Sequence, residues 1–260
     1  MPATTVGFSG SGASRRALRW ALQSCASSAR PLHVVVGPGG GHTDLDELLA
    51  EELERVPGRE PPVDVTLTTD DPVHTLLRAA ADGADLVLGC GRDAGARPTG
   101  DVLGPVLAAA PGPVVVVGPR AVLTPARRLL VVSSAQDAVT DWVLRRGRDL
   151  PVHLLTTWRA PLLADGGTGR RHAHLAAVAV HHTVRARLSA GTHRPVRAEV
   201  AEGELADVLP RRIGVGDLVV LAAPSLRALP LRTLRAPVVL VPGRVVRTVV
   251  DLREGVRTAG

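Results

Sequence analysis

The segment Gly83-Ala84-Asp85-Leu86-Val87-Leu88 has a second version later in the chain, Val215-Gly216-Asp217-Leu218-Val219-Val220. Each version is followed by proline and an apolar run, Pro113-Val114-Val115-Val116-Val117 in the first case and Pro237-Val238-Val239-Leu240-Val241 in the second. An internal repeat means that each copy is a folding unit of the same kind. We therefore expect two similar domains in tandem.

The spacing of the repeat locates the main difference between the copies. Ser9 precedes Ser133 by 124 positions, as Pro113 precedes Pro237, whereas Asp85 precedes Asp217 by 132. The first copy therefore carries eight additional residues after its fourth strand. They fall in a glycine-rich stretch, residues 89–104.

Hydrophobic spacing predicts strands and helices in alternation through both copies. Such alternation favours a parallel sheet with helices on both faces, because parallel strands need a crossover connection. In the first copy we expect strands at 5–8, 32–36, 63–67, 86–88 and 114–117, and helices at 13–29, 44–56, 72–80 and 102–110. In the second we expect strands at 129–132, 152–156, 196–200, 218–221 and 238–241, helices at 137–148, 174–190 and 204–213, and a helix broken by Pro230 at 225–234.

These elements divide the chain into a first domain at 1–120, a linker at 121–126, a second domain at 127–243 and a basic tail at 244–260. The whole chain has 260 residues, which is enough for two domains of ordinary size.

Charge and aromatic content weigh against nucleic-acid binding. The formal charge is +6, and all 31 basic residues are arginine, with no lysine in the chain. The arginines are scattered along the chain, and one phenylalanine and three tryptophans are too few to form a series that stacks on bases. We expect no nucleic-acid partner.

Composition also indicates a cytoplasmic protein without a membrane partner. No apolar run approaches the roughly 18 residues of a membrane helix, and no signal-like segment follows Met1. Cys25 and Cys90 are the only cysteines, so we expect reduced thiols and no disulfide framework.

Several blocks in a fixed order resemble the universal stress protein family in its tandem form. They are VGFSGSGASRRALRWAL at 6–22, LHVVV at 32–36, DPV at 71–73, GADLVLG at 83–89 and PVVVV at 113–117. The resemblance covers roughly residues 3–243. It implies two tandem, doubly wound, five-stranded parallel-sheet domains of the α/β class, Rossmann-like and similar to the adenine nucleotide alpha hydrolases. It also implies a regulatory, non-catalytic role in stress responses.

The resemblance further implies an adenine-nucleotide site in the first domain, at the carboxyl ends of the strands, where open parallel sheets bind ligands. ATP is the cofactor so implied, and the residues that would form the site are Ser9, Gly10, Val35, Gly89, Gly91, Gly95, Gly104, Pro105 and Val106.

Three positions depart from the family's pattern at this site. Ser9 stands where ATP-binding members have an aspartate, Ala94 stands at the middle glycine with Gly95 one residue late, and Pro105 replaces a phosphate-binding hydroxyl. In the second domain the matching segment, Ala222-Ala223-Pro224-Ser225-Leu226, has no glycine. We therefore expect an eroded nucleotide site in the first domain and none in the second.

Two alternatives remain at this stage. One is an ATP-binding universal stress protein that uses the first domain, with Arg92 and Arg97 pairing with the phosphates. The other is an ATP-pyrophosphatase enzyme, because residues 8–14 also resemble the loop Ser-Gly-Gly-x-Asp-Ser of that class. Ser11 and Ala13 depart from that loop, and no nucleophile is paired with a base, so we expect no enzyme.

The remaining reactive residues have structural interpretations. His172, His174, His181 and His182 lack the i, i+4 spacing of a metal pair and are expected to face solvent. Cys90 is interpreted as a small buried residue. Trp20 and Trp142 fall near equivalent helix positions and are expected to anchor the core or the domain interface.

The fifth strands carry the expectation for partners. In the resembled family this strand pairs antiparallel across a twofold axis. We therefore expect Val114–Val117 and Val238–Val241 to pair within one chain, as an intramolecular pseudo-dimer. Association of two chains into a homodimer is left open.

Overall fold

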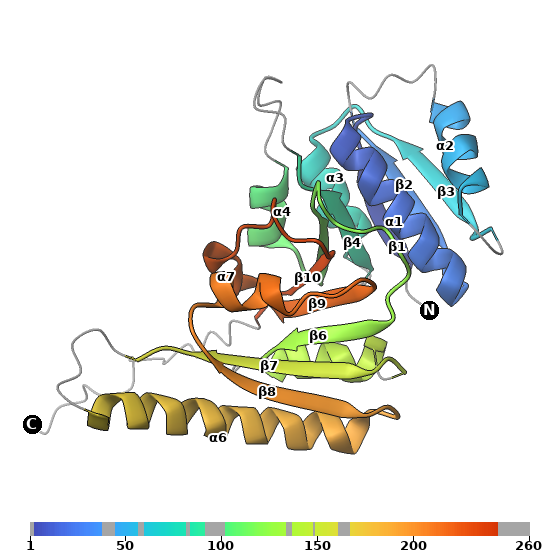
Figure 1. Ribbon diagram of the computed structural model, residues 1–260. Coiled ribbons are helices and arrows are strands. Elements are labelled where there is room, and N and C mark those ends of the chain that lie inside the picture. Colours follow the sequence, from blue (N-terminus) through green and yellow to red (C-terminus); the bar gives the residue numbers. More distant parts are fainter. Residues whose placement is uncertain are drawn as a thin grey trace, which may run out of the picture.

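The computed structural model describes residues 3–37, 45–56, 60–81, 84–91, 102–133, 137–147, 149–160 and 167–243. Strands and helices alternate along both halves of the chain (Figure 1). The strands form one ten-stranded sheet. The strands are β1 (Thr4–Phe8), β2 (Leu32–Val36), β3 (Val63–Leu67), β4 (Asp85–Gly89), β5 (Val114–Val117), β6 (Arg128–Val132), β7 (Val152–Trp158), β8 (Val196–Glu202), β9 (Asp217–Ala222) and β10 (Val238–Val241).

The strand order is β3-β2-β1-β4-β5-β10-β9-β6-β7-β8, so each half contributes the same doubly wound arrangement of five parallel strands. The two halves meet where β5 and β10 pair antiparallel, with Val239 opposite Val115. Every other pairing in the sheet is parallel. The fold class expected from the repeat is thereby confirmed.

The helices of the first half follow local signals in the sequence. They are α1 (Gly12–Ser28), α2 (Leu45–Glu54), α3 (Pro72–Ala79) and α4 (Leu103–Ala109). Ser11 caps α1 by accepting a hydrogen bond from the backbone N–H of Ser14. Asp71 caps α3 by accepting from the backbone N–H of Val73, with Pro72 at the first helical position.

The second half has less regular helices than the sequence predicts. They are α5 (Asp137–Trp142), α6 (Gly167–Gly191) and α7 (Leu205–Val208), with the shorter turns η2 (Val143–Gly147), η3 (Leu209–Arg211) and η4 (Ala223–Ala228). The expected helix at 137–148 is wrong in its second part, because the chain changes there to the π-helical turn η2. The expected helix at 204–213 is likewise short, and Pro210 lies in the 3-10 turn that ends it. The broken helix expected near Pro230 is the 3-10 turn η4.

Two apolar layers cover the two faces of the sheet. One layer joins α1, α2, α5 and α6 to the sheet and includes Trp20 and Trp142, which are both 6% exposed. The other layer joins α3, α4, α7 and η3 to the opposite face. Both tryptophans are core residues, as expected.

Side-chain direction corrects the register of the repeat. Val6 and Val87 point into the α1 layer, whereas the residues 124 and 132 positions later, Leu130 and Val219, point into the opposite layer. Val115 and Val239 do share a face. The offset read from identical letters therefore holds for the fifth strands but is displaced by one residue in β6 and β9.

Candidate functional site

The carboxyl ends of β1 and β4 bring four of the expected site residues to one edge of the first half. Ser9 and Gly10 follow β1, while Gly89 ends β4 and Gly91 lies just beyond it. Ser9 is exposed and Gly91 is half-buried. Gly10 has a φ of 73°, a left-handed conformation that glycine adopts without strain, so it sets the turn between β1 and α1.

Three serine hydroxyls lie at this turn and contact one another. Ser9 Oγ is 3.1 Å from Ser11 Oγ and 3.4 Å from Ser14 Oγ, and Ser11 Oγ is 3.2 Å from Ser14 Oγ. Ser14 Oγ also donates to the backbone carbonyl of Ser11, at 2.9 Å. We call Ser9, Ser11 and Ser14 the serine cluster. Its three hydroxyls are hydrogen-bond partners of one another at the positive end of α1, and Ser11 also caps the helix.

Gly89 serves close packing at this edge. A Cβ atom at Gly89 would lie 2.2 Å from the carbonyl oxygen of Ala13 and 3.0 Å from the backbone nitrogen of Ser14. The end of β4 therefore touches the backbone of the first turn of α1. This contact explains the glycine without a phosphate ligand.

The other expected residues have different surroundings. Gly104 and Pro105 are exposed in the first turn of α4, a helix without a side-chain cap. Val35 and Val106 are buried in the layer formed by α3 and α4, where both side chains pack in the core. Gly95, with Arg92, Ala94 and Arg97, lies outside the described residues. Cys90, interpreted from the sequence as a buried residue, is only half-buried and packs against the same layer.

In the second half, a buried polar chain that the sequence analysis missed stands at the corresponding edge. Thr156 Oγ1 in β7 donates to Ser133 Oγ at 2.8 Å and lies 2.8 Å from His181 Nδ1 in α6. Ser133 continues the face of Val131, so it stands at the position of Phe8 rather than of Ser9. Burial, then the charges of His182 and Arg185, lower the pKa of His181 and favour its neutral form.

The expectation that all four histidines of this region face solvent is wrong for His181, which is 5% exposed. Its position on α6 is three residues before Val184 and seven before Leu188, and both of these are buried in the core. That spacing was the available signal, because residues three and seven apart share one face of a helix.

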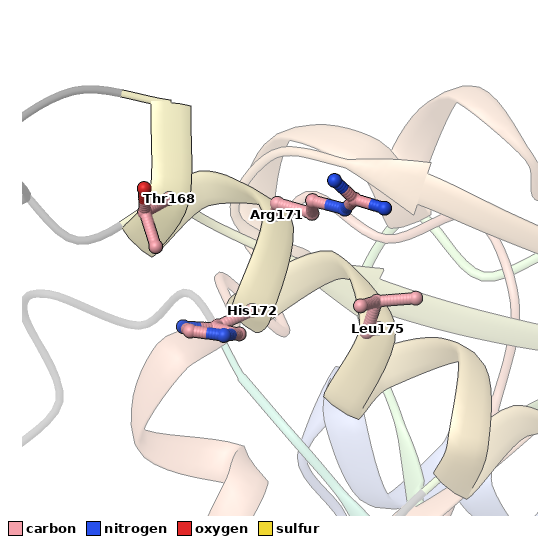
Figure 2. Close-up of a pocket in the computed structure, with 4 residues that line it drawn as sticks. All are labelled: Thr168, Arg171, His172 and Leu175. Atoms are coloured by element: carbon pink, nitrogen blue, oxygen red, sulfur yellow. The ribbon is translucent and has the colours of Figure 1, made fainter.

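The first turns of α6 carry a shallow pocket of about 570 Å³. Figure 2 shows its lining residues, Thr168, Arg171, His172 and Leu175, along this one helix. Leu175 is 52% exposed. Nearby, the ring of His174 meets Trp158 edge-on, with the ring centroids 4.9 Å apart. Within the described ranges, no group of three or more His, Cys, Asp or Glu residues could hold a metal ion.

Comparison by sequence gives no match, since no family model and no curated protein match the chain significantly. Solved structures do match. A universal stress protein from Archaeoglobus fulgidus DSM 4304 aligns with a TM-score of 0.58 and 14% identity, over 93% of this chain and 96% of its own. The chain has the universal stress protein fold. Another protein assigned to that family, from Pseudomonas aeruginosa UCBPP-PA14, aligns with a TM-score of 0.55 and 13% identity, over 93% of this chain and 94% of its own.

A functionally unknown protein from Pseudomonas aeruginosa PAO1 gives the same TM-score and identity, with 93% of both chains covered. These alignments span both halves, so the universal stress protein fold applies to the whole tandem arrangement. At identities this low the likeness concerns the fold. Ligands and activity must therefore be argued from the residues of this chain. In its described part, no helix has the length and apolar character needed to cross a membrane.

Proposed function

We propose that this protein is a non-catalytic stress-response regulator of the universal stress protein type, with an eroded nucleotide site in its first domain and none in its second. The observation that carries the proposal is the serine cluster. At the place where the resembled family binds the nucleoside through a carboxylate, Ser9 presents a hydroxyl that is engaged with Ser11 and Ser14.

Among the described residues, the first turn of α1 gives no replacement for that carboxylate. α1 has no acidic residue in its first turn, and its last turn has no basic residue. Pro105, at the phosphate-binding position, has no hydroxyl and no backbone N–H to offer. In the second domain, the Ser133–Thr156–His181 chain supports a structural role because each contact in it lies within the fold.

The alternative function, ATP binding by the first domain, is favoured by one feature. The amino end of α1 follows the glycine turn at Gly10, and an uncapped helix dipole there would attract phosphate. In this chain the Ser11 hydroxyl already accepts the N–H of Ser14 at 3.2 Å, which uses one of the donors that a phosphate would need. The Ser11 cap thus weighs against the alternative.

The test is a nucleotide-binding measurement on the full chain. Protein is denatured to release bound nucleotide for chromatography, and ATP is then titrated calorimetrically into emptied protein. We expect no co-purified nucleotide and a Kd weaker than about 1 mM, which corresponds to roughly 4 kcal/mol of binding free energy. One ATP per chain with micromolar affinity would overturn the proposal in favour of the ATP-binding alternative.

The same preparation tests the enzyme alternative. We expect no release of pyrophosphate from ATP, because residues 8–14 lack the aspartate of the pyrophosphatase loop. We also propose a cytoplasmic location and an intramolecular pseudo-dimer as the working unit. The free thiols of Cys25 and Cys90 support the location, and the antiparallel contact of β5 with β10 supports the pseudo-dimer.

A further inference from the structure

A cavity of about 390 Å³ lies at the junction of the two halves, away from the edge discussed above. Val87, Val115 and Val239 line it from the strands β4, β5 and β10. Trp20 of α1 and Trp142 of α5 line it from the covering helices. Its volume lies in the range of about 300–1,000 Å³ that is typical of small-molecule sites.

The cavity is at the opposite edge of the sheet from the serine cluster. Thr4 and Asp85, which also line it, are the first residues of β1 and β4. The carboxyl-edge site implied by the family resemblance begins at Ser9, beyond the other end of β1. A ligand in this cavity would therefore be separate from any nucleotide at the carboxyl edge.

One wall of the cavity is shaped by the π-helical turn η2. Arg146 and Gly147 of this turn line the cavity next to Trp142. A Cβ atom at Gly147 would lie 2.2 Å from Cδ1 of Leu129, so glycine allows the wide turn to settle against β6. Isolated π-helical turns occur frequently at functional sites. In the first half, α1 passes the cavity as a regular helix.

Two buried polar atoms in the cavity wall lack hydrogen-bond partners in the described structure. Asp85 Oδ2 accepts from Arg30 at 3.2 Å, whereas Asp85 Oδ1 is 3.9 Å from the nearest nitrogen of Arg146, which is too long for a hydrogen bond. The indole N–H of Trp142 also has no acceptor. Two residues of the wall thus each hold one buried polar atom without a partner, an acceptor on Asp85 and a donor on Trp142, and a buried polar atom without a hydrogen bond costs stability.

The charges around the cavity favour an uncharged ligand. Its described lining residues include two arginines, Arg30 and Arg146, and two acids, Asp85 and Asp149. These charges balance, so a charged ligand would bring an uncompensated charge into a largely apolar space.

From these contacts we propose that the cavity binds a small uncharged carboxamide carried on a ring. The amide N–H donates to Asp85 Oδ1, and the amide carbonyl accepts from the indole N–H of Trp142. The ring packs against the aliphatic residues of the sheet and the two tryptophans, where aromatic contacts add to apolar burial. The proposal requires the side chains of Asp85 and Trp142 to rotate so that these two buried atoms face the ligand.

The tryptophan content of the chain allows a direct test with benzamide as the probe. There are three tryptophans and no tyrosine, so a Trp158→Phe variant emits only from Trp20 and Trp142. A second substitution in that background, Ser24→Leu, fills the cavity beside α1 and keeps the backbone carbonyl of Ser24, which accepts hydrogen bonds from Ser27 and Ser28. Ser189→Leu, on the exposed surface of α6, is the matched control.

We expect saturable changes in tryptophan emission with a Kd on the order of 1 mM, as for a fragment-sized ligand. Ser24→Leu should weaken binding at least tenfold, while Ser189→Leu should leave it unchanged. N,N-dimethylbenzamide lacks the donor and benzoate carries a charge, so each should bind at least tenfold more weakly. The melting temperature of the unsubstituted protein should rise more with benzamide than with N,N-dimethylbenzamide or benzoate.

Absence of a saturable signal, or equal binding by the Ser24→Leu and Ser189→Leu variants, would overturn the proposal. Equal binding of benzamide and benzoate would overturn the assigned ligand class. The outcome is independent of the nucleotide experiment, since neither substitution touches the serine cluster.

Discussion

Alanine substituted at two glycines near the start of α1 should change stability in opposite directions. At Gly89 the new Cβ would lie 2.2 Å from the oxygen and 2.4 Å from the carbon of the Ala13 carbonyl. Carbon atoms in contact are normally about 3.5–4.0 Å apart, so the first turn of α1 must move by an ångström or more. Both contacts are with backbone, which cannot rotate away. We expect a loss of about 3 kcal/mol, the upper end for overpacking.

At Gly12 a Cβ atom meets nothing within 4 Å, and the residue is the first of the helix. Alanine there restricts the unfolded chain without straining the folded one, which should stabilise the protein by about 0.5 kcal/mol. The free energy of unfolding from urea titration, followed by circular dichroism, measures both variants. Surface substitutions usually change the unfolding free energy by no more than about 0.5 kcal/mol. A Gly89→Ala variant whose unfolding free energy stays within that range of the parent would refute the packing argument.

Three further substitutions test buried polar contacts. Arg128→Met should cost about 3 kcal/mol in urea titrations, because Asp217, whose side chain is 3% exposed, loses both charge-assisted bonds; a near-neutral result would contradict the ion pair. Thr156→Val should cost about 2 kcal/mol, since His181 Nδ1 is left without a partner, and an unchanged urea midpoint would exclude that bond. Burial raises the pKa of Glu52, but hydrogen bonds from two arginines outweigh it and hold that pKa below 4.5. The ionised Glu52 therefore stabilises the folded state above pH 4.5, and this stabilisation is lost as the pH falls further. A Glu52→Gln variant should lose less unfolding free energy than the parent between about pH 5 and 3, and parallel pH profiles of the two proteins would count against this role.

The sequence was sufficient to predict the alternating strands and helices, because apolar periodicity is a local signal. The register between the copies was less accessible. Matching identical letters aligned Asp85 with Asp217, although the two side chains point to opposite faces. A shift of one residue in a strand moves every side chain to the other face of the sheet. The alternation of buried faces, rather than the identity of the residues, therefore determines the register between the copies.

The candidate sites were predicted less completely than the fold. The glycine turn and the strand ends followed from the repeat, but the packing role of Gly89 depends on how closely β4 approaches α1. His181 was missed although its spacing from Val184 and Leu188 places it on the buried face of α6. The cavity between the halves depends on residues from both domains and on η2, a departure from helical geometry that no local motif marks.

Because the two halves belong to one polypeptide, the two sides of their contact can differ in sequence. In a homodimer with twofold symmetry, every residue at the axis appears twice, so the interface must complement itself. Here the strands β5 and β10 are covalently linked, and dilution cannot separate them. Each side can consequently accept changes that the other does not copy. The described junction is asymmetric in this way. One side has the regular helix α1 and Asp85, and the other has a π-helical turn and an indole N–H without an acceptor. Two identical subunits related by an exact twofold axis would carry the same residues and the same helix geometry on both sides.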